Sequence, residues 1–226
     1  MTQELSESSL VIDTDNLPRY IAVEGPIGVG KTTLAKRLAL SFNYQILLEQ
    51  AEENPFLERF YRNRRQSALA TQLFFLFQRA QQMEDLRQSD IFAPVQVADF
   101  LMEKDRLFAR INLDEDEFAL YEKVYQQLTF DAPKPDLVVY LQAPVDTLMG
   151  RIHERGVDAE KFIERSYLED LNDAYSQFFL YYDESPLLII NAAEIDFVND
   201  DQQYFQLVEH MLKTRSGRHY FNPTFF

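Results

Sequence analysis

Short apolar runs alternate along the chain with longer segments whose apolar positions recur at helical spacing. Near-continuous apolar runs separated by helices are typical of a parallel sheet covered on both faces, rather than of an antiparallel sandwich. The pattern predicts five strands, at Tyr20 to Val23, Gln45 to Leu48, Val95 to Ala98, Leu137 to Leu141 and Leu187 to Ile190. The predicted fold class is therefore α/β, with a five-stranded parallel sheet and helices on both faces.

Three of the segments between these strands are predicted to be amphipathic helices. Residues 68–86 carry one apolar stripe, formed by Leu73, Leu76, Phe77, Ala80 and Met83. Comparable stripes predict helices over residues 118–128 and 167–179. Such stripes cover either a buried core or a subunit interface.

The length and the distribution of residues indicate one domain between two tails. A chain of 226 residues is long enough for a single α/β domain with a full core. We expect residues 1–17 to be a mobile tail, residues 18–213 a single domain and residues 214–226 a C-terminal tail. The last segment contains Tyr220, Phe221, Phe225 and Phe226, so we expect it to dock on the protein body or on a partner.

The composition narrows the possible classes of function. The net charge of −15 opposes binding to a nucleic acid polymer, because its phosphate backbone would be repelled. The lack of cysteine excludes a disulfide framework and a thiolate nucleophile. No apolar run approaches the roughly 20 residues that span a bilayer. We therefore expect a cytoplasmic protein without a membrane partner.

A glycine-rich segment lies between the first predicted strand and a helical run. It reads Gly25-Pro26-Ile27-Gly28-Val29-Gly30-Lys31-Thr32, followed by Thr33, and matches the pattern GxxxxGK followed by serine or threonine. Backbone N–H groups of such a loop point at the β-phosphate of ATP, and the helix N-terminus adds partial positive charge. Lys31 is expected to bridge phosphates, and the Thr32 hydroxyl is expected to ligate Mg²⁺.

The loop alone leaves the reaction open, because ATPases, GTPases and kinases all use it. A GTPase is disfavoured, since the chain contains neither an NKxD base-recognition segment nor a DxxG switch segment. A kinase or an ATP-driven binding module remains.

Two carboxylates directly follow predicted strands, at Glu49 and Asp99. Ligands of open α/β sheets lie beyond the carboxyl ends of the strands. Asp99 is expected to hold Mg²⁺, directly or through water. Glu49 is expected to face the γ-phosphate from the acceptor side, orient a hydroxyl and accept its proton. For either residue alone, a solvated strand-end carboxylate is the alternative interpretation.

Arg151 and Arg155 are four residues apart in a predicted helix. Two like charges at this spacing destabilise an isolated helix by about 0.2–0.5 kcal/mol, so an anionic group should offset them. They either belong to a lid that closes over the transferring phosphoryl oxygens, or pair with Glu154 or Asp158.

Several segments together carry a resemblance to a known family. They are the loop through Thr33, Glu49 ahead of Asn54-Pro55-Phe56-Leu57, Phe60-Tyr61, Thr71-Gln72, Asp99-Phe100 through Asp105-Arg106, Arg-x-x-x-Arg-Gly at 151–156, and Asp196-Phe197. Over residues 19–200 the chain resembles the deoxyribonucleoside kinases. The resemblance implies a P-loop kinase fold with a short arginine-bearing lid, transfer of the ATP γ-phosphoryl group to the 5′-hydroxyl of a deoxynucleoside, and a homodimer formed through the long helices.

The resemblance also implies roles for individual residues. Glu49 matches the catalytic base, and Asp196 with Phe197 matches part of the ATP site. Tyr61 and Glu160 match positions that hold the sugar 3′-hydroxyl, while Gln72, Arg79 and Asp105 match positions that face the base. An amide offers both a donor and an acceptor to a base edge, and a guanidinium group reads purine acceptors. These residues favour a purine deoxynucleoside as substrate.

Two departures from the family are visible. Asp99-Phe100-Leu101 stands where animal relatives have Glu-Arg-Ser, and Val157 stands where many relatives have a lid arginine. Asp99 can still hold Mg²⁺. The missing lid arginine implies slower transfer, unless Arg165 or Lys161 takes its role.

Two other functions are alternatives to a deoxynucleoside kinase. A thymidylate-type nucleoside monophosphate kinase needs an extra cation for the acceptor phosphate and often has Asp-Arg-Tyr after the third strand. Here Phe100 follows Asp99, which favours a neutral acceptor. A non-catalytic ATP-binding module has no need for Glu49 together with the lid arginines.

Overall fold

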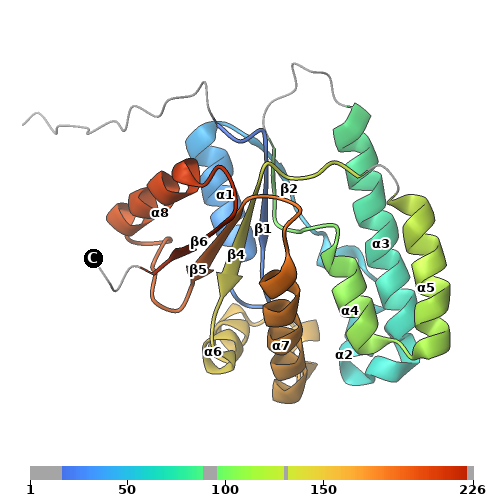
Figure 1. Cartoon of the computed structure of the whole chain (residues 1–226). Helices are drawn as coiled ribbons and strands as arrows, with labels where there is room; N and C mark the ends of the chain where they lie inside the picture. The colour runs from blue at the N-terminus through green and yellow to red at the C-terminus, as the bar shows by residue number, and fades with distance from the viewer. Residues whose placement is uncertain (1–16, 89–95, 130–131, 223–226) are drawn as a thin grey trace, which may run out of the picture.

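The computed structural model of the chain describes residues 17–88, 96–129 and 132–222. Within these residues one parallel sheet has the strand order β2-β3-β1-β4-β5-β6 (Figure 1). The strands are β1 Tyr20–Glu24, β2 Gln45–Leu47, β3 Gln96–Ala98, β4 Leu137–Gln142, β5 Leu187–Asn191 and β6 Arg218–Phe221. Because all strands point the same way, their carboxyl ends meet along one edge, where ligands of such sheets bind.

The described helices are α1 Lys31–Phe42, α2 Leu57–Arg62, α3 Arg64–Gln88, α4 Lys104–Asn112, α5 Glu115–Leu128, α6 Val145–Arg155, α7 Arg165–Tyr181 and α8 Asp201–Lys213. The described residues also form two 3₁₀ turns, η2 Ala51–Glu53 and η3 Ala159–Phe162. In Figure 1, α1 and α8 lie on one side of the sheet, and α3, α4, α5 and α7 lie on the other. None of the described helices is long and apolar enough to cross a membrane.

The core has two parts. The larger cluster surrounds the central strands, where all five residues of β1 are buried. The smaller cluster fills the space between α3, α4 and α5 and includes Leu76, Phe100 and Tyr121. Strands that are buried on both faces have no solvent side for polar residues, so they consist of near-continuous apolar runs. This burial is the reason why apolar runs located β1, β3, β4 and β5.

The sequence predictions for the helices and for five strands are confirmed, with boundaries that shift by a few residues at most; Val95 lies outside the described residues. The predicted total of five strands is wrong, because β6 adds a sixth. It pairs with β5 in parallel register, from Leu187 opposite Arg218 to Ile190 opposite Phe221. At the sheet edge only Phe221 needs to be buried, so β6 has no apolar run that would identify it.

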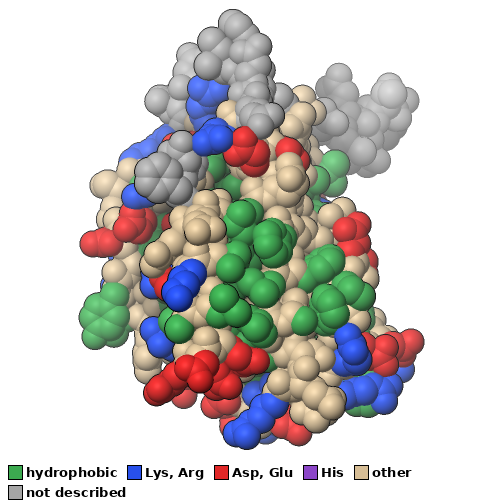
Figure 2. Space-filling view, turned by 90° about the vertical axis from the view of Figure 1, so that its right-hand side faces the viewer, with side chains coloured by type: hydrophobic (Ala, Val, Ile, Leu, Met, Phe, Trp, Pro, Cys, Tyr) green, Lys and Arg blue, Asp and Glu red, His purple; other side chains and the backbone are tan. Residues whose placement is uncertain are grey.

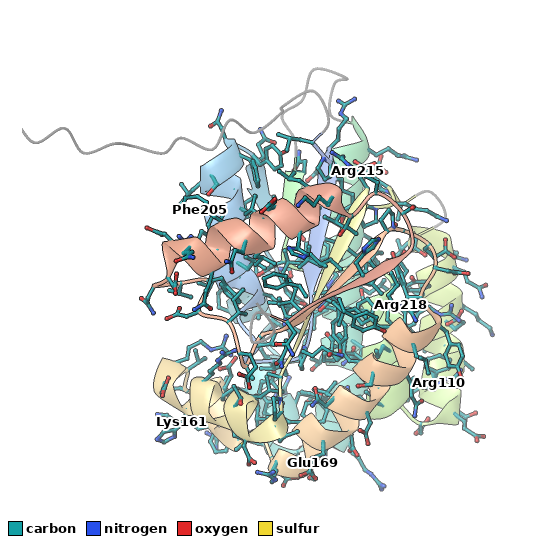
Figure 3. The ribbon with its side chains drawn as sticks, turned by 60° about the vertical axis from the view of Figure 1, so that its left-hand side comes forward. Arg110, Lys161, Glu169, Phe205, Arg215 and Arg218 are labelled. Atoms are coloured by element: carbon teal, nitrogen blue, oxygen red, sulfur yellow. The ribbon has the colours of Figure 1, made fainter. Side chains whose placement is uncertain are left out.

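The segment expected to be a C-terminal tail therefore contributes to the sheet. Phe221 is buried, Tyr220 is exposed, and Phe225 and Phe226 lie outside the described residues. Arg218 donates hydrogen bonds to the carbonyl oxygens of Phe179 (2.9 Å) and Leu180 (2.8 Å), which ties β6 to the end of α7 (Figure 3). The predicted mobile tail over residues 1–17 lies outside the described residues, apart from Leu17.

Candidate active site

The glycine-rich segment joins the end of β1 to the start of α1, as the sequence predicted. Gly30 is the N-cap residue of α1 and adopts a left-handed conformation (φ 105°). Gly28 also has a positive φ of 84°, and a Cβ atom there would lie 2.9 Å from the carbonyl oxygen of Leu148. The lack of a side chain at Gly28 therefore lets the loop pack against α6, whereas a Cβ atom at Gly30 would lie 3.2 Å from the ring of Phe197.

Lys31 extends back along this loop. Its Nζ atom donates hydrogen bonds to the carbonyl oxygens of Gly25 (2.7 Å) and Pro26 (3.1 Å). Burial, and then the nearby ammonium group of Lys104, lower the pKa of Lys31. An anion bound at the loop would favour the charged form of this lysine.

Thr32 and Asp99 lie against each other between the loop and the end of β3. The Thr32 hydroxyl donates to Oδ2 of Asp99 at 2.5 Å, and the Glu49 amide donates to Oδ1 at 2.7 Å. Two hard oxygen ligands at the mouth of a phosphate loop fit a Mg²⁺ ion that takes its other ligands from water and phosphate. The residues present therefore suit the metal expected from the sequence.

Glu49 lies between cations from three helices. Arg79 of α3 forms an ion pair with its Oε1 atom, and Nζ of Lys104 in α4 lies 3.1 Å from its Oε2 atom. Burial opposes ionisation of this carboxyl, but Arg79, Lys104 and Lys31 outweigh it and lower the pKa of Glu49 from 4.5 to about 2. Glu49 is consequently ionised at neutral pH, the state that can accept a proton.

Arg79 also forms an ion pair with Asp105 of α4, and both side chains are almost fully buried. Burial is the largest effect on the carboxyl of Asp105, and it raises its pKa despite the neighbouring guanidinium group. Within the part of the chain that the structure describes, Nε of Arg79 and Oδ2 of Asp105 are buried without a hydrogen-bond partner. Unpaired buried polar atoms are costly, so a polar group of a ligand would stabilise this pair.

A cavity of about 1030 Å³ opens in front of Glu49. Its lining includes Tyr61, Gln72 and Arg79 together with the ring of Phe75. Gln72 is 2% exposed and comes from the same helix as Arg79. The structure thus brings the predicted sugar and base residues to one cavity, with Asp105 behind Arg79.

A second cavity of about 860 Å³ lies on the other side of the loop. Its lining includes the loop residues from Gly28 to Thr33 and, across from them, Arg151, Asp196 and Phe197. Gly28, Lys31, Thr32 and Arg155 line both cavities. Two cavities that meet at one lysine can hold a donor and an acceptor of a transferred group next to each other.

Arg151 and Arg155 of α6 form hydrogen bonds with partners other than Glu154 and Asp158, the two carboxylates that the sequence suggested. Arg151 donates to the carbonyl oxygens of Val29 (2.9 Å) and Ala192 (2.7 Å). Arg155 donates to Glu160 at 2.6 Å and 3.1 Å. In place of Glu154 or Asp158, Arg151 thus has backbone carbonyls as partners, and Arg155 has Glu160, which follows the turn at Gly156.

Neither of the two side chains considered as substitutes for a lid arginine faces the cavities in this structure. Arg165 pairs with Asp146 at 2.6 Å and with Glu169 at 2.9 Å. Lys161 pairs with Asp158 at 2.5 Å. Lys161 and Glu169 both lie at the outer surface in Figure 3. Val157 itself lines the larger cavity.

Sequence reasoning missed two buried charges, Glu24 and Lys104. Glu24 is fully buried, and its carboxylate accepts hydrogen bonds from the Gly25 amide, the Leu101 amide and the Tyr175 hydroxyl, at 2.8 to 2.9 Å. Lys104 is 2% exposed. Glu24 could have been singled out from the sequence, because it ends an apolar strand directly before the loop. For Lys104, no feature of the neighbouring sequence indicates that the side chain is buried.

In this α/β fold the glycine-rich loop lies between two adjoining cavities. This arrangement fits the class of phosphotransferases. A family model described as deoxynucleoside kinase matches residues 21–215. The chain belongs to the deoxynucleoside kinase family, whose members are ATP-dependent phosphotransferases. The matched region ends before β6.

Individual relatives agree with this assignment. The chain is 37% identical to a deoxyguanosine kinase from Bacillus subtilis (strain 168), over 87% of this chain and 97% of that protein. It is 30% identical to a deoxyadenosine kinase from Dictyostelium discoideum, over 92% of this chain and 84% of that protein. Among solved structures, the deoxyadenosine kinase from M. mycoides with bound dATP aligns with a TM-score of 0.73 and 25% identity, over 86% and 98% of the two chains. These relatives favour a kinase of nucleosides over the two alternative functions.

Proposed function

We propose that this kinase transfers the γ-phosphoryl group of ATP to the 5′-hydroxyl of a deoxynucleoside, and that it prefers purine deoxynucleosides. The observation that carries the proposal is the meeting of two cavities at Lys31, with the ionised carboxylate of Glu49 on one side. Such an arrangement serves positioning and electrostatic stabilisation, which dominate phosphoryl transfer.

ATP would occupy the smaller cavity. Loop residues 25–33 would hold its phosphates through backbone N–H groups, with Asp196 and Phe197 on the opposite wall. Lys31, Arg151 and Arg155 would stabilise negative charge on the phosphoryl oxygens during transfer. For Arg151 and Arg155, this requires that they leave or share their present partners when the nucleotide binds.

Thr32 and Asp99 would hold Mg²⁺, directly or through water. A Mg²⁺ ion held there would supply positive charge next to the phosphate oxygens of the nucleotide. The close approach of the Thr32 hydroxyl to the Asp99 carboxylate supports this assignment.

The deoxynucleoside would occupy the larger cavity. Glu49 accepts the proton of the 5′-hydroxyl as the 5′-oxygen forms its bond to the γ-phosphorus. The bond from that phosphorus to the oxygen of the β-phosphate breaks, and its electron pair leaves with ADP. Tyr61 and Glu160 would bind the sugar 3′-hydroxyl, and Gln72, Arg79 and Asp105 would face the base. The deoxyguanosine and deoxyadenosine kinases among the relatives support the purine preference.

A homodimer and a cytoplasmic location belong to the same proposal. Figure 2 shows hydrophobic side chains gathered on the face of the molecule that α3 and α5 form. Phe77, Leu120 and Leu128 of these helices are exposed large hydrophobic residues. An exposed apolar face on two long helices fits a subunit interface. In the cytoplasm both ATP and deoxynucleosides are available to the enzyme.

A coupled phosphorylation assay with ATP and Mg²⁺ tests the proposed reaction. The acceptors are the four deoxynucleosides, their ribonucleoside counterparts and thymidylate. We expect turnover of deoxynucleosides, fastest with a purine, and none for Lys31→Ala, whereas the exposed-surface variant Lys213→Met keeps full activity. Turnover of thymidylate alone, or of pyrimidines ahead of purines, contradicts the corresponding part of the proposal.

A further inference from the structure

We propose that Lys104 is a positioning residue for phosphoryl transfer, because its ammonium group connects Glu24, the carboxylate that anchors the phosphate loop, to Glu49, the base on the acceptor side. The inference rests on the proposed function of Glu49 and deepens it. Lys104 would act through Glu49 rather than by contact with the transferred group.

The location of Lys104 supports this connection. Lys104 is the first residue of α4, and its Nζ atom lies 3.1 Å from Oε2 of Glu49 and 3.6 Å from Oε2 of Glu24. A lysine that is 2% exposed is stable in its charged form only when it is paired. The two carboxylates provide that pairing, and they leave the ammonium group little freedom to move.

Glu24 is a rigid point of attachment. One of its oxygens accepts hydrogen bonds from the Gly25 amide (2.8 Å) and the Tyr175 hydroxyl (2.9 Å), and the other accepts one from the Leu101 amide (2.8 Å). These bonds join the start of the phosphate loop, α7 and the segment after β3. A side chain bound to Glu24 therefore has a defined position relative to the loop.

Glu49 has a different cation at each oxygen. Arg79 pairs with Oε1 and Lys104 with Oε2, so the orientation of the carboxylate is defined by two helices. Arg79 extends to Asp105 and the base side of the cavity, whereas Lys104 extends to Glu24 and the phosphate side. Of these two cations, Lys104 alone relates the proposed base to the loop that holds the phosphates.

Phe100 stands where animal relatives have an arginine, and its ring has no charge that could pair with Glu49. Phe100 is fully buried in the apolar cluster between α3, α4 and α5, together with Leu76 and Tyr121. The segment after β3 thus supplies its positive charge to Glu49 through Lys104, the first residue of the next helix.

A double-mutant cycle on the full-length enzyme tests the proposal. The variants are Lys104→Met, Glu49→Gln and the double substitution, and Lys213→Met serves as the matched exposed control. Turnover and KM are measured for ATP and for the deoxynucleoside that is turned over fastest. We expect Lys104→Met to lower kcat about tenfold or more, with a KM for ATP within about twofold of the parent enzyme. In the Glu49→Gln background the same substitution should add less than about a twofold loss.

Lys104→Arg adds a test by conservative rescue. A guanidinium group at this position can still pair with both carboxylates, so we expect kcat well above that of Lys104→Met. Thermal unfolding of each variant is measured in parallel; if Lys104→Met does not fold, Lys104→Gln, which keeps a hydrogen-bond donor, replaces it in the cycle.

The outcomes separate the two proposals. Losses that multiply in the double variant, or a loss confined to thermal stability, overturn the role of Lys104 and leave Glu49 as the base. Full activity of Glu49→Gln overturns the proposed base itself, and the positioning role falls with it.

Discussion

At the scale of single residues, the site is organised by charges that are buried in contact with each other. Glu49, Arg79 of α3 and the adjacent residues Lys104 and Asp105 of α4 come from three parts of the chain and form one connected set of ion pairs. A buried ion pair adds little net stability, but loss of one partner leaves the other charge uncompensated. Substitutions here should therefore affect either the chemistry or the stability, according to which charge is left alone.

Substitution of Glu49 should affect the chemistry. In Glu49→Gln the amide cannot accept the hydroxyl proton, so we expect kcat to fall by about 10²–10⁴-fold, the range typical of a positioned general base. Binding of ATP, measured by calorimetry, should stay near that of the parent. Glu169→Gln removes a carboxylate from the exposed surface and should leave kcat unchanged. Parent-level activity of Glu49→Gln would refute the assignment.

Substitution of Arg79 should affect the stability. Arg79→Ala leaves the carboxylates of Glu49 and Asp105 without their shared guanidinium group, so we expect the free energy of unfolding to fall by about 3–5 kcal/mol. Removal of the half-exposed Arg106, which pairs with Glu122, should change it by about 0–1 kcal/mol. Denaturant unfolding measures both values. Equal losses of unfolding free energy in the two variants would show that the buried ion pairs do not stabilise the fold. The role of Arg79 in base selectivity is better tested with Arg79→Lys.

At the scale of secondary-structure elements, the sheet continues beyond the region that the family model matches. That region ends at residue 215, and β6 extends the sheet at the β5 edge. Phe221 packs into the main core and lies against the ring of His210 in α8, at 4.7 Å between ring centroids. We interpret β6 as an element that stabilises α8 and the sheet edge, away from the cavities.

Two adjacent residues of β6 allow this interpretation to be tested. Phe221→Ala removes a ring that is 2% exposed and should lower the free energy of unfolding by about 3 kcal/mol or more. Tyr220→Ala changes a residue that is 68% exposed, and the effect should stay within about 0.5 kcal/mol. Both variants should keep the parent kcat at temperatures where they are folded. A large loss of kcat in folded Phe221→Ala would assign β6 a role in the reaction.

At the scale of the whole molecule, the apolar face of α3 and α5 bears on the proposed homodimer. Phe77 (54% exposed) and Leu120 (51% exposed) belong to helices whose opposite faces are buried. α3 also carries Gln72 and Arg79, so a partner packed on this helix would support the wall of the larger cavity from outside.

Charge on this face should separate the subunits. We expect Phe77→Glu combined with Leu120→Glu to give a monomer, because like charges would be desolvated in the interface. Leu40→Glu, on α1 at the other side of the sheet, should leave the mass unchanged although Leu40 is 84% exposed. Sedimentation velocity measures the mass of each variant. A parent protein that is monomeric at micromolar concentration would contradict the proposed dimer.

Local sequence by itself determined the five strands β1 to β5, the three amphipathic helices and the loop from Gly25 to Thr33. In each of these, the decisive residues are close together along the chain: an apolar run, a helical stripe or a contiguous motif. Family resemblance added Gln72 and Arg79, which line the larger cavity, and Asp105, which forms an ion pair with Arg79.

Only the tertiary structure decided which charges are partners. The hydroxyl of Tyr175 reaches Glu24 across 151 positions of sequence, and Lys104 reaches Glu49 across 55. The edge strand β6 was likewise identified by its pairing with β5, because four residues with one buried side chain carry no periodic signal. A polar residue has the same local pattern on the surface and in a buried ion pair. Burial and the partner's position, which depend on the folded chain, distinguish the two.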